Sequence, residues 1–464
     1  MATHRLYAPA ALLADGWAED VTFEIDDRGR IAGVARRSNP AGVETAGGPV
    51  IPGMPNLHSH AFQRAMAGLA ERAGPSEDSF WTWRETMYRF VAHLTPERLE
   101  AIATQAYVEM LKAGYTAVGE FHYVHKDRDG RTFADPAEMS WRVWAAARTA
   151  GIALSHLPVL YTAGGFGGRP AGDAQRRFLL GLDEFLELVR TLMAAASGSE
   201  GVCVGIAPHS LRAVPPDLLA RAVEGLRQLD AEAPVHIHIA EQEREVADCL
   251  AWSGQRPVDW LFDHAPVDRR WCLVHATHMT PDETARLAAS GAVAGLCPTT
   301  EANLGDGLFP AVAYVGAGGR WGIGSDSHIS IDPVEELRWL EYGQRLIHHR
   351  RNLLQRTDEP STGASLWRHA AAGGAEVLGI AAGRLETGAR ADLLVLDGDA
   401  ATLAGRAGDT LLDALIFAAN TNPIRHVMVG GRWVVRDGRH PREDETLSRF
   451  RTAIREIAEE KDGR

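Results

Sequence analysis

Residues 50–60 read VIPGMPNLHSH, a short apolar run that ends in two histidines two positions apart. The run is predicted to form a buried strand, and side chains two apart on a strand point to the same face. His58 and His60 can therefore converge on one metal ion. An H-x-H motif alone is weak evidence, because two histidines at this spacing also occur by chance on a surface or in a core.

Short apolar runs of this kind recur along the chain, and amphipathic segments separate them. The strand candidates are residues 50–60, 116–123, 153–161, 202–210, 234–241, 272–275, 292–298 and 321–325. The helix candidates are residues 96–113, 136–150, 174–196, 215–229, 281–289, 333–349 and 363–378. Eight strands alternating with helices predict an α/β fold, a (β/α)8 barrel of the TIM type. A doubly wound open sheet is the alternative, but no Gly-x-Gly-x-x-Gly follows a strand candidate.

Both ends of the chain have sequence patterns typical of β-strands, which differ from the alternating pattern found in the middle. The first fifty residues suggest hairpins, and β-like segments return after Gly383. We expect residues 1–50 and 384–440 to form one composite β-sandwich domain. Residues 51–383 would then form the barrel, and residues 441–464 a charged C-terminal helix.

The composition excludes several classes of function. The chain has 464 residues, of which 45% are hydrophobic and 23% charged, and its formal net charge is −13. An acidic protein of this kind is not expected to bind nucleic acid or an anionic membrane. If its substrate is anionic, local arginines must overcome the unfavourable overall field.

The compartment is expected to be the cytoplasm. The four cysteines form no C-x-x-C pair, which is typical of reduced structural thiols; they are Cys203, Cys249, Cys272 and Cys297. The N-terminus lacks a basic region followed by a long apolar stretch. No window approaches the ~18 apolar residues that a membrane span needs.

Metal-ligating residues also stand at the ends of two later strand candidates. Residues 236–241 read HIHIAE, and residues 324–328 read GSDSH. The carboxyl ends of barrel strands form the catalytic face, so we expect these residues to meet His58 and His60 there. Three histidines and Asp326, with no cysteine, suit a catalytic metal that keeps one position open for water.

The same residues resemble a known family. Residues 52–60, 391–395 and 429–431 look like the first-strand motif and the returning sandwich strands of the amidohydrolase superfamily. More narrowly, residues 58–64, 79–84 and 207–212 are similar to the formimidoylglutamate deiminase family, which acts in bacterial histidine degradation. The resemblance covers nearly the whole chain.

The resemblance implies a metal site with one divalent ion per subunit, for which zinc is expected. Its ligands would be His58, His60, His238 and Asp326. His238 is preferred to His236 because Glu241 completes an H-x-x-E pattern, and His236 is interpreted as structural. No lysine lies in any strand candidate, which disfavours a bridged two-metal site. A site of this composition also accepts iron or manganese.

The resemblance further implies three catalytic residues, Glu241, His275 and Asp326. The reaction would convert N-formimidoyl-L-glutamate and water to N-formyl-L-glutamate and ammonia. Asp326 would accept the water proton, Glu241 would carry a proton to the leaving nitrogen, and His275 would polarise the attacked centre. Otherwise Glu241 would be a solvated loop carboxylate and His275 a core histidine.

A substrate with two carboxylates needs cationic donors that converge on it. By resemblance, the carboxylate-binding set is Gln63, Arg84, Tyr123, His209 and Arg212. Arg64 competes with its neighbour for such a role, and Arg84 could instead lie on the surface. Trp321 either lines the pocket or packs in the core.

Other functions stay open at this point. The nearest alternative is a deaminase of a nucleobase, a nucleoside or formimino-aspartate. A non-catalytic binding or structural protein would have no need of a proton carrier such as Glu241. The resemblance also implies a homodimer, and the aromatic loop at residues 80–90 could be a lid over the site or an interface.

Overall fold

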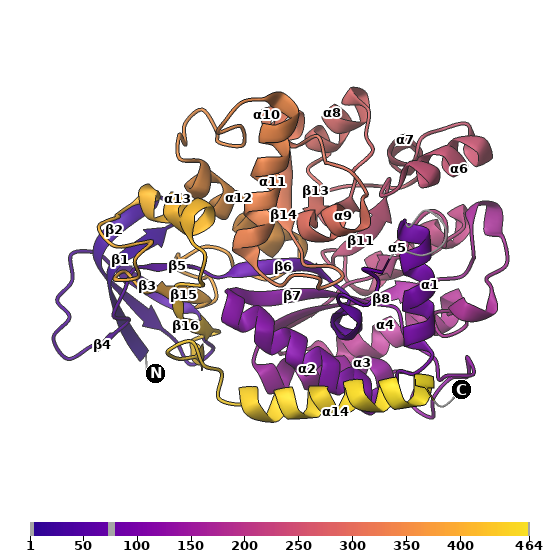
Figure 1. The fold of residues 1–464 in the computed structure, drawn as a ribbon, viewed down its shortest axis with the longest axis horizontal. Coiled ribbons are helices and arrows are strands. Elements are labelled where there is room, and N and C mark those ends of the chain that lie inside the picture. The colour runs from indigo at the N-terminus through magenta and orange to yellow at the C-terminus, as the bar shows by residue number, and fades with distance from the viewer. Residues whose placement is uncertain (1–3, 73–78, 463–464) are drawn as a thin grey trace.

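The computed structural model describes residues 4–72 and 79–462. Figure 1 shows a barrel surrounded by helices, with a separate sheet beside it at the left of the view. The described chain therefore has the predicted α/β architecture. Among the described residues, no helix is both long and apolar enough to cross a membrane.

The barrel consists of two curled sheets of parallel strands. One sheet contains β6 (Met54–Ser59), β7 (Tyr115–His122), β8 (Ala153–Leu160), β9 (Val202–Val204) and β10 (Ala207–Pro208). The other contains β11 (Val235–Ile239), β12 (Trp271–His275), β13 (Val293–Leu296) and β14 (Arg320–Ile323). Bridges at Ser59–Asp326, Ile206–Val235 and Ser210–His238 join the two sheets at both seams.

Helices cover the outside of the barrel. They are α1 (Phe80–Val91), α2 (Pro96–Ala113), α3 (Glu138–Ala150), α4 (Leu182–Ala196), α5 (Pro216–Leu229), α6 (Glu243–Ser253), α7 (Pro257–His264), α8 (Pro281–Ser290), α9 (Pro298–Leu304), α10 (Ala311–Gly316), α11 (Pro333–His348), α12 (Thr362–Val377) and α13 (Asp409–Ala418). Six of them begin with a proline, whose fixed φ suits the first turn and whose missing N–H costs nothing there.

The second sheet is built from both ends of the chain. Its strands are β1 (His4–Leu13), β2 (Gly16–Ile25), β3 (Ile31–Ala35), β4 (Glu44–Thr45), β5 (Val50–Pro52), β15 (Leu393–Leu396), β16 (Ile424–Val429) and β17 (Arg432–Val435). The order is β17-β16-β15-β5-β1-β2-β3, and β4 pairs with β1. Leu6, Phe23 and Leu393, all fully buried, belong to its own apolar core. The helix α14 (Glu443–Asp462) then runs back along α2 at the bottom of Figure 1.

The single strand expected over residues 50–60 is in fact two strands in different sheets. Gly53 separates them, and a Cβ at this position would lie 2.3 Å from the Thr116 side chain. The N–H of Gly53 donates to the carbonyl oxygen of Asp392 in the end sheet. The chain thus turns from one sheet into the other at a residue without a side chain.

Two helix predictions are also corrected. The helix α4 begins at Leu182 and not at residue 174, because residues 173–175 form a separate 3-10 turn. The aromatic segment at residues 80–90, expected to be a loop, is the helix α1. Ser79 caps it by accepting the N–H of Trp81, and the Thr82 hydroxyl accepts the N–H of Ser79 in return.

Candidate metal centre and active-site pocket

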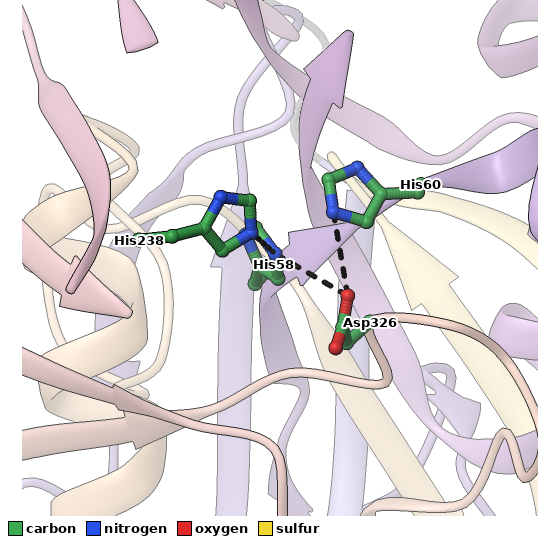
Figure 2. Close-up of side chains that lie close together, drawn as sticks. All are labelled: His58, His60, His238 and Asp326. Atoms are coloured by element: carbon green, nitrogen blue, oxygen red, sulfur yellow. Dashed lines mark hydrogen bonds and ion pairs between the residues drawn. The ribbon is translucent and has the colours of Figure 1, made fainter. Parts of the chain in front are cut away.

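Three imidazoles and one carboxylate meet at the carboxyl ends of β6, β11 and β14. The ligand atoms of His58, His60, His238 and Asp326 all lie within 4.8 Å of one another. The Nε2 atoms of His58 and His60 are 3.4 and 3.3 Å from Asp326 Oδ1, and Nε2 of His238 is 3.0 Å from that of His58. Figure 2 shows these nitrogens turned toward a common centre. Ligands bound to zinc at 2.0–2.1 Å in a tetrahedron are about 3.3 Å apart, so the spacing fits such an ion.

The hydrogen bonds made by the Nδ1 atoms of His60 and His238 also indicate a metal site. Nδ1 of His60 is 2.9 Å from the carbonyl oxygen of Phe121, and Nδ1 of His238 is 3.1 Å from that of His209. A carbonyl oxygen only accepts, so each Nδ1 donates and each Nε2 of the neutral ring presents a lone pair. The lone pair of His60 then faces the carboxylate of Asp326. Acceptors that face one another repel unless a cation lies between them, and the four residues therefore fit a divalent metal ion.

The protonation states of these groups suit the same role. Burial lowers the pKa of His58 to about 3 and lowers the pKa of His60, so both rings are neutral. Burial alone would raise the pKa of Asp326, but its hydrogen bond with His58 and the neighbouring imidazoles hold it below the ordinary value. Neutral imidazoles and an ionised carboxylate are the forms that bind metals.

The backbone is strained where the strands end. Ala240, His275, Asp326 and His328 have φ values of 49°, 70°, 45° and 59°, in the left-handed region that side chains rarely adopt. Such strain persists only where the surroundings hold it, and it concentrates at functional sites. Here it turns the chain sharply at the rim of the barrel, where the candidate ligands lie.

A buried hydrogen-bond network links β6 to β14 next to the four candidate metal ligands. The Ser59 hydroxyl donates to Glu120 Oε2 at 2.6 Å, and the second oxygen of Glu120 accepts the N–H of Ala61. His328 contacts the hydroxyls of Ser59 and Ser325, each at 3.0 Å. The two strands that carry three of the four candidate ligands are thus held in a defined register.

His236 lies away from this cluster. Its Nε2 donates to the carbonyl oxygen of Val377 at 3.0 Å, at the end of α12. The ring is fully buried, and burial lowers its pKa to about 4. The histidine is therefore outside the candidate ligand group and bonded to the backbone, which fits a structural role.

Glu241 and His275 lie beside the cluster and face each other. His275 Nε2 is 3.8 Å from Glu241 Oε1 and 3.9 Å from Asp326 Oδ2, and its Nδ1 is 3.2 Å from Glu301 Oε1. Burial alone would lower the pKa of His275, but these carboxylates raise it to about 10. Burial raises the pKa of Glu241 to about 7, against the opposing charges of His275 and Arg212. Glu241 can thus carry a proton near neutral pH, next to an imidazolium.

One pocket opens onto this centre and brings the predicted substrate residues together. Its lining is His60, Gln63, Phe80, Trp83, Arg84, Met87, Tyr88, Tyr123, Tyr161, Phe178, His209, Arg212, His238, Glu241, His275, Leu304 and Asp326. All five residues of the predicted carboxylate-binding set are among them. Within the described part of the chain, Gln63 Oε1, Arg84 Nε and Arg212 Nε are buried without a hydrogen-bond partner. Buried polar atoms of this kind call for a ligand or water.

Two residues left open by the sequence do not line the pocket. Arg64 pairs with Glu109 at 2.8 Å and donates to the carbonyl oxygen of His328. Trp321 is buried at the other end of β14, where its backbone packs against Gly373. Neither residue is part of the lining of the pocket that contains the candidate metal ligands.

Sequence reasoning missed three acidic residues close to the centre. Glu301 contacts His275, and Asp306 accepts a hydrogen bond from Gln242. Glu245 accepts the N–H of Glu241. These residues come from helices and loops without a recognisable motif, although the four-residue spacing of Glu241 and Glu245 was visible in the sequence.

Comparison with protein families gives two matches. Residues 50–434 match the family described as "Amidohydrolase family". Residues 3–48 match "Formimidoylglutamate deiminase HutF, N-terminal domain". A formimidoylglutamate deiminase from Pseudomonas aeruginosa is 57% identical over 455 residues, which cover 97% of this chain and 99% of that protein.

Solved structures agree with these matches. An amidohydrolase from Brucella melitensis is 48% identical, superposes with a TM-score of 0.92, and is covered over 100% of its chain and 98% of this one. An adenosine deaminase from Xanthomonas campestris, solved with bound zinc, has a TM-score of 0.81 at 22% identity, with 98% of each chain covered. At that identity, the second likeness shows the fold alone.

Proposed function

The chain belongs to the amidohydrolase family, and on that premise we propose that it is a metal-dependent hydrolytic deiminase. It converts N-formimidoyl-L-glutamate and water to N-formyl-L-glutamate and ammonia, a step of histidine degradation. The observation that best supports this substrate is the presence of two arginines, Arg84 and Arg212, in the pocket that opens onto the candidate metal ligands. The 57% identity to the Pseudomonas deiminase supports the same reaction.

The proposed ligands are His58, His60, His238 and Asp326. When bound, a divalent ion at this site supplies a water whose pKa is lowered toward about 7. Asp326, whose carboxylate lies 3.4 and 3.3 Å from the Nε2 atoms of His58 and His60, would accept the first proton of that water. The water oxygen would then add to the formimidoyl carbon, both water protons would end on the imino nitrogen, and the bond between that carbon and that nitrogen would break to release ammonia.

Glu241 is the proposed proton carrier. Its raised pKa lets it exist in both forms near neutral pH, as a general acid and base requires. His275, whose Nε2 faces Glu241 and Asp326, would stabilise negative charge that develops on the attacking oxygen. Glu301 contacts the far nitrogen of His275 and fixes its ring.

The predicted carboxylate-binding set would bind the two carboxylates of the substrate. Its members are Gln63, Arg84, Tyr123, His209 and Arg212. Arg84 lies on α1, stacked 4.5 Å from the ring of Trp81, and Arg212 follows β10. Gln63 donates to the Tyr123 hydroxyl at 2.7 Å, which leaves its own oxygen free within the described residues. The ring of His209 lies 6.0 Å from that of Tyr123 and 5.0 Å from that of His238, measured between ring centroids, and its carbonyl oxygen accepts a hydrogen bond from His238.

Replacing either Arg84 or Arg212 by methionine is expected to raise KM about 10- to 100-fold. Each hydrogen bond to a charged group contributes about 1.5–3 kcal/mol, and 1.4 kcal/mol corresponds to a factor of ten. The measurement is ammonia release at varied substrate concentration. The matched control is Arg244→Met, because Arg244 also stacks on Trp81, at 4.7 Å, but is 65% exposed and does not line the pocket.

A substrate analogue without the side-chain carboxylate would show which arginine binds which carboxylate of the substrate. The variant whose arginine binds that carboxylate should then show no further rise in KM. An unchanged KM in both variants with the full substrate would contradict the proposed carboxylate-binding set.

A deaminase of a nucleobase or nucleoside is the second candidate, because the fold is shared with an adenosine deaminase. A neutral base does not need two arginines. Purified protein is expected to release ammonia from N-formimidoyl-L-glutamate at least about 100-fold faster than from adenosine, cytosine or guanine at equal concentration, since unmatched charged groups cost several kcal/mol. Formimino-aspartate has both carboxylates but one methylene fewer, so its release of ammonia is expected to be about 10- to 100-fold slower. Turnover of a neutral base without turnover of formimidoylglutamate would overturn the proposal.

We propose zinc as the metal, since its preferred ligands and spacing match the site, although iron and manganese accept the same donors. We also propose that the protein is a homodimer in the cytoplasm, as the family resemblance implies. Metal analysis of the purified protein and its mass in solution test these two points.

A further inference from the structure

Glu245 is a buried acidic residue that touches both the proposed proton carrier and a proposed substrate-binding arginine. It is the third residue of α6, and its side chain is fully buried. Its Oε2 accepts the N–H of Glu241 at 3.2 Å. Its Oε1 lies 3.8 Å from Nε of Arg212. The first turn of a helix favours a carboxylate, so the charge is in a suitable place.

Arg212 lies between two carboxylates without a hydrogen bond to either. Its Nη2 is 3.7 Å from Glu241 Oε2, and its Nε is 3.8 Å from Glu245 Oε1. Both distances exceed the 2.7–3.2 Å of an N–H···O hydrogen bond. The Arg212 side chain is only 12% exposed, so water screens these attractions weakly. Both carboxylates attract the guanidinium, and neither accepts a hydrogen bond from it. Its N–H groups therefore remain available to a ligand.

Helix capping by itself does not explain this arrangement. The bond to the Glu241 N–H uses Oε2 of Glu245, whereas Oε1 faces Arg212 and has no hydrogen-bond partner among the residues described. If the charge of Glu245 were absent, Glu241 would be the one carboxylate of the described residues left in contact with Arg212. The guanidinium would then close the gap to Glu241 and form a direct charged hydrogen bond.

We propose that Glu245 is a positioning residue that holds Arg212 away from Glu241. Its charge keeps the arginine donors free for the substrate carboxylate, and it keeps Glu241 free to exchange protons. The inference rests on the proposed function and deepens it, because it explains how an acid and an arginine work side by side in one buried pocket.

The test is a comparison of Glu245→Gln with and without Arg212. Glutamine has the same shape, and its amide oxygen can still accept the Glu241 N–H, so the variant removes mainly the charge. We expect E245Q to lower kcat about 10- to 100-fold, the size of effect that a misplaced catalytic group produces. In an Arg212→Met background the same change should lower kcat less than about threefold, because no arginine remains to pair with Glu241. Glu243→Gln, on the exposed face of the same turn, is the matched control and should behave as the parent.

The kinetic results distinguish a positioning role of the Glu245 charge from a purely structural role of the side chain. An equal loss of kcat in both backgrounds would mean that Glu245 only supports the backbone, and no loss in E245Q would mean that its charge is unimportant. Either result overturns the proposal. If E245Q does not fold, Glu245→Asp keeps the charge but withdraws it from Arg212, and its loss of kcat should depend on Arg212 in the same way.

A crystal structure of E245Q gives a readout that is independent of activity. Arg212 Nη2 should move from 3.7 Å to within about 3.2 Å of Glu241 Oε2, and an unchanged distance would contradict the inference. If the parent protein acts on a different substrate, the proposed function fails, but the kinetic comparison can be repeated on that substrate. The two failures are therefore distinguishable.

Discussion

Replacing Glu241 by glutamine is expected to lower kcat about 10²- to 10⁴-fold, while KM changes by no more than a few-fold. General acid–base catalysis contributes this much, and glutamine cannot carry the proton. The amide has the size of the carboxyl group, so the contact of residue 241 with His275 keeps its geometry. The measurement is steady-state ammonia release from N-formimidoyl-L-glutamate, together with the metal content of the variant.

The metal content serves as the internal control for Glu241. Because Glu241 is not among the proposed ligands, the variant should hold as much metal as the parent protein. Normal turnover would refute its role as proton carrier. Loss of the metal along with activity would instead make Glu241 a ligand, contrary to the geometry of the cluster.

Removing the metal is expected to have an effect at least as large. Treatment with a chelator, or the change Asp326→Asn, should reduce activity about 10³-fold or more, because metal activation of water is worth several kcal/mol and each 1.36 kcal/mol is a factor of ten. The chelated parent should recover when zinc is added back, whereas the variant should recover little. Adding iron or manganese in parallel identifies the ion that gives the highest kcat.

Asp306 provides a matched control for Asp326. It is also a buried aspartate near the centre, but its hydrogen bond is to Gln242 and it lies outside the ligand cluster. Asp306→Asn should therefore retain one metal ion per chain. Full activity of the chelated parent protein, with metal shown to be absent, would contradict a metal-dependent reaction.

Much of the fold followed from local patterns in the sequence. Alternating apolar runs and amphipathic segments predicted the barrel, and prolines predicted where helices such as α2 and α11 begin. The predicted membership of the amidohydrolase superfamily is confirmed by the match over residues 50–434. The H-x-H of His58 and His60 could be interpreted because a strand has a period of two.

Patterns failed where neighbouring parts of the fold determine the local structure. The helix α1 escaped notice because its aromatic residues face both the core and the pocket, so its exposed polar face is narrow and consists of Glu85 and Arg89. Phe90 is buried, while Trp83 and Tyr88 line the pocket. The break between β5 and β6 depends on the approach of Thr116 to Gly53, a contact between segments more than sixty residues apart.

The sequence by itself predicted the candidate site residues and the strand ends on which they lie, because strand period and barrel topology are repetitive. Only the tertiary structure decided which of these residues meet. It placed His238, which the H-x-x-E pattern had favoured over His236, among the candidate ligands, and it put Glu301 behind His275. It also set Arg212 between Glu241 and Glu245. The physical reason is that burial and charge act through distances in space, which only the packing of the whole chain establishes.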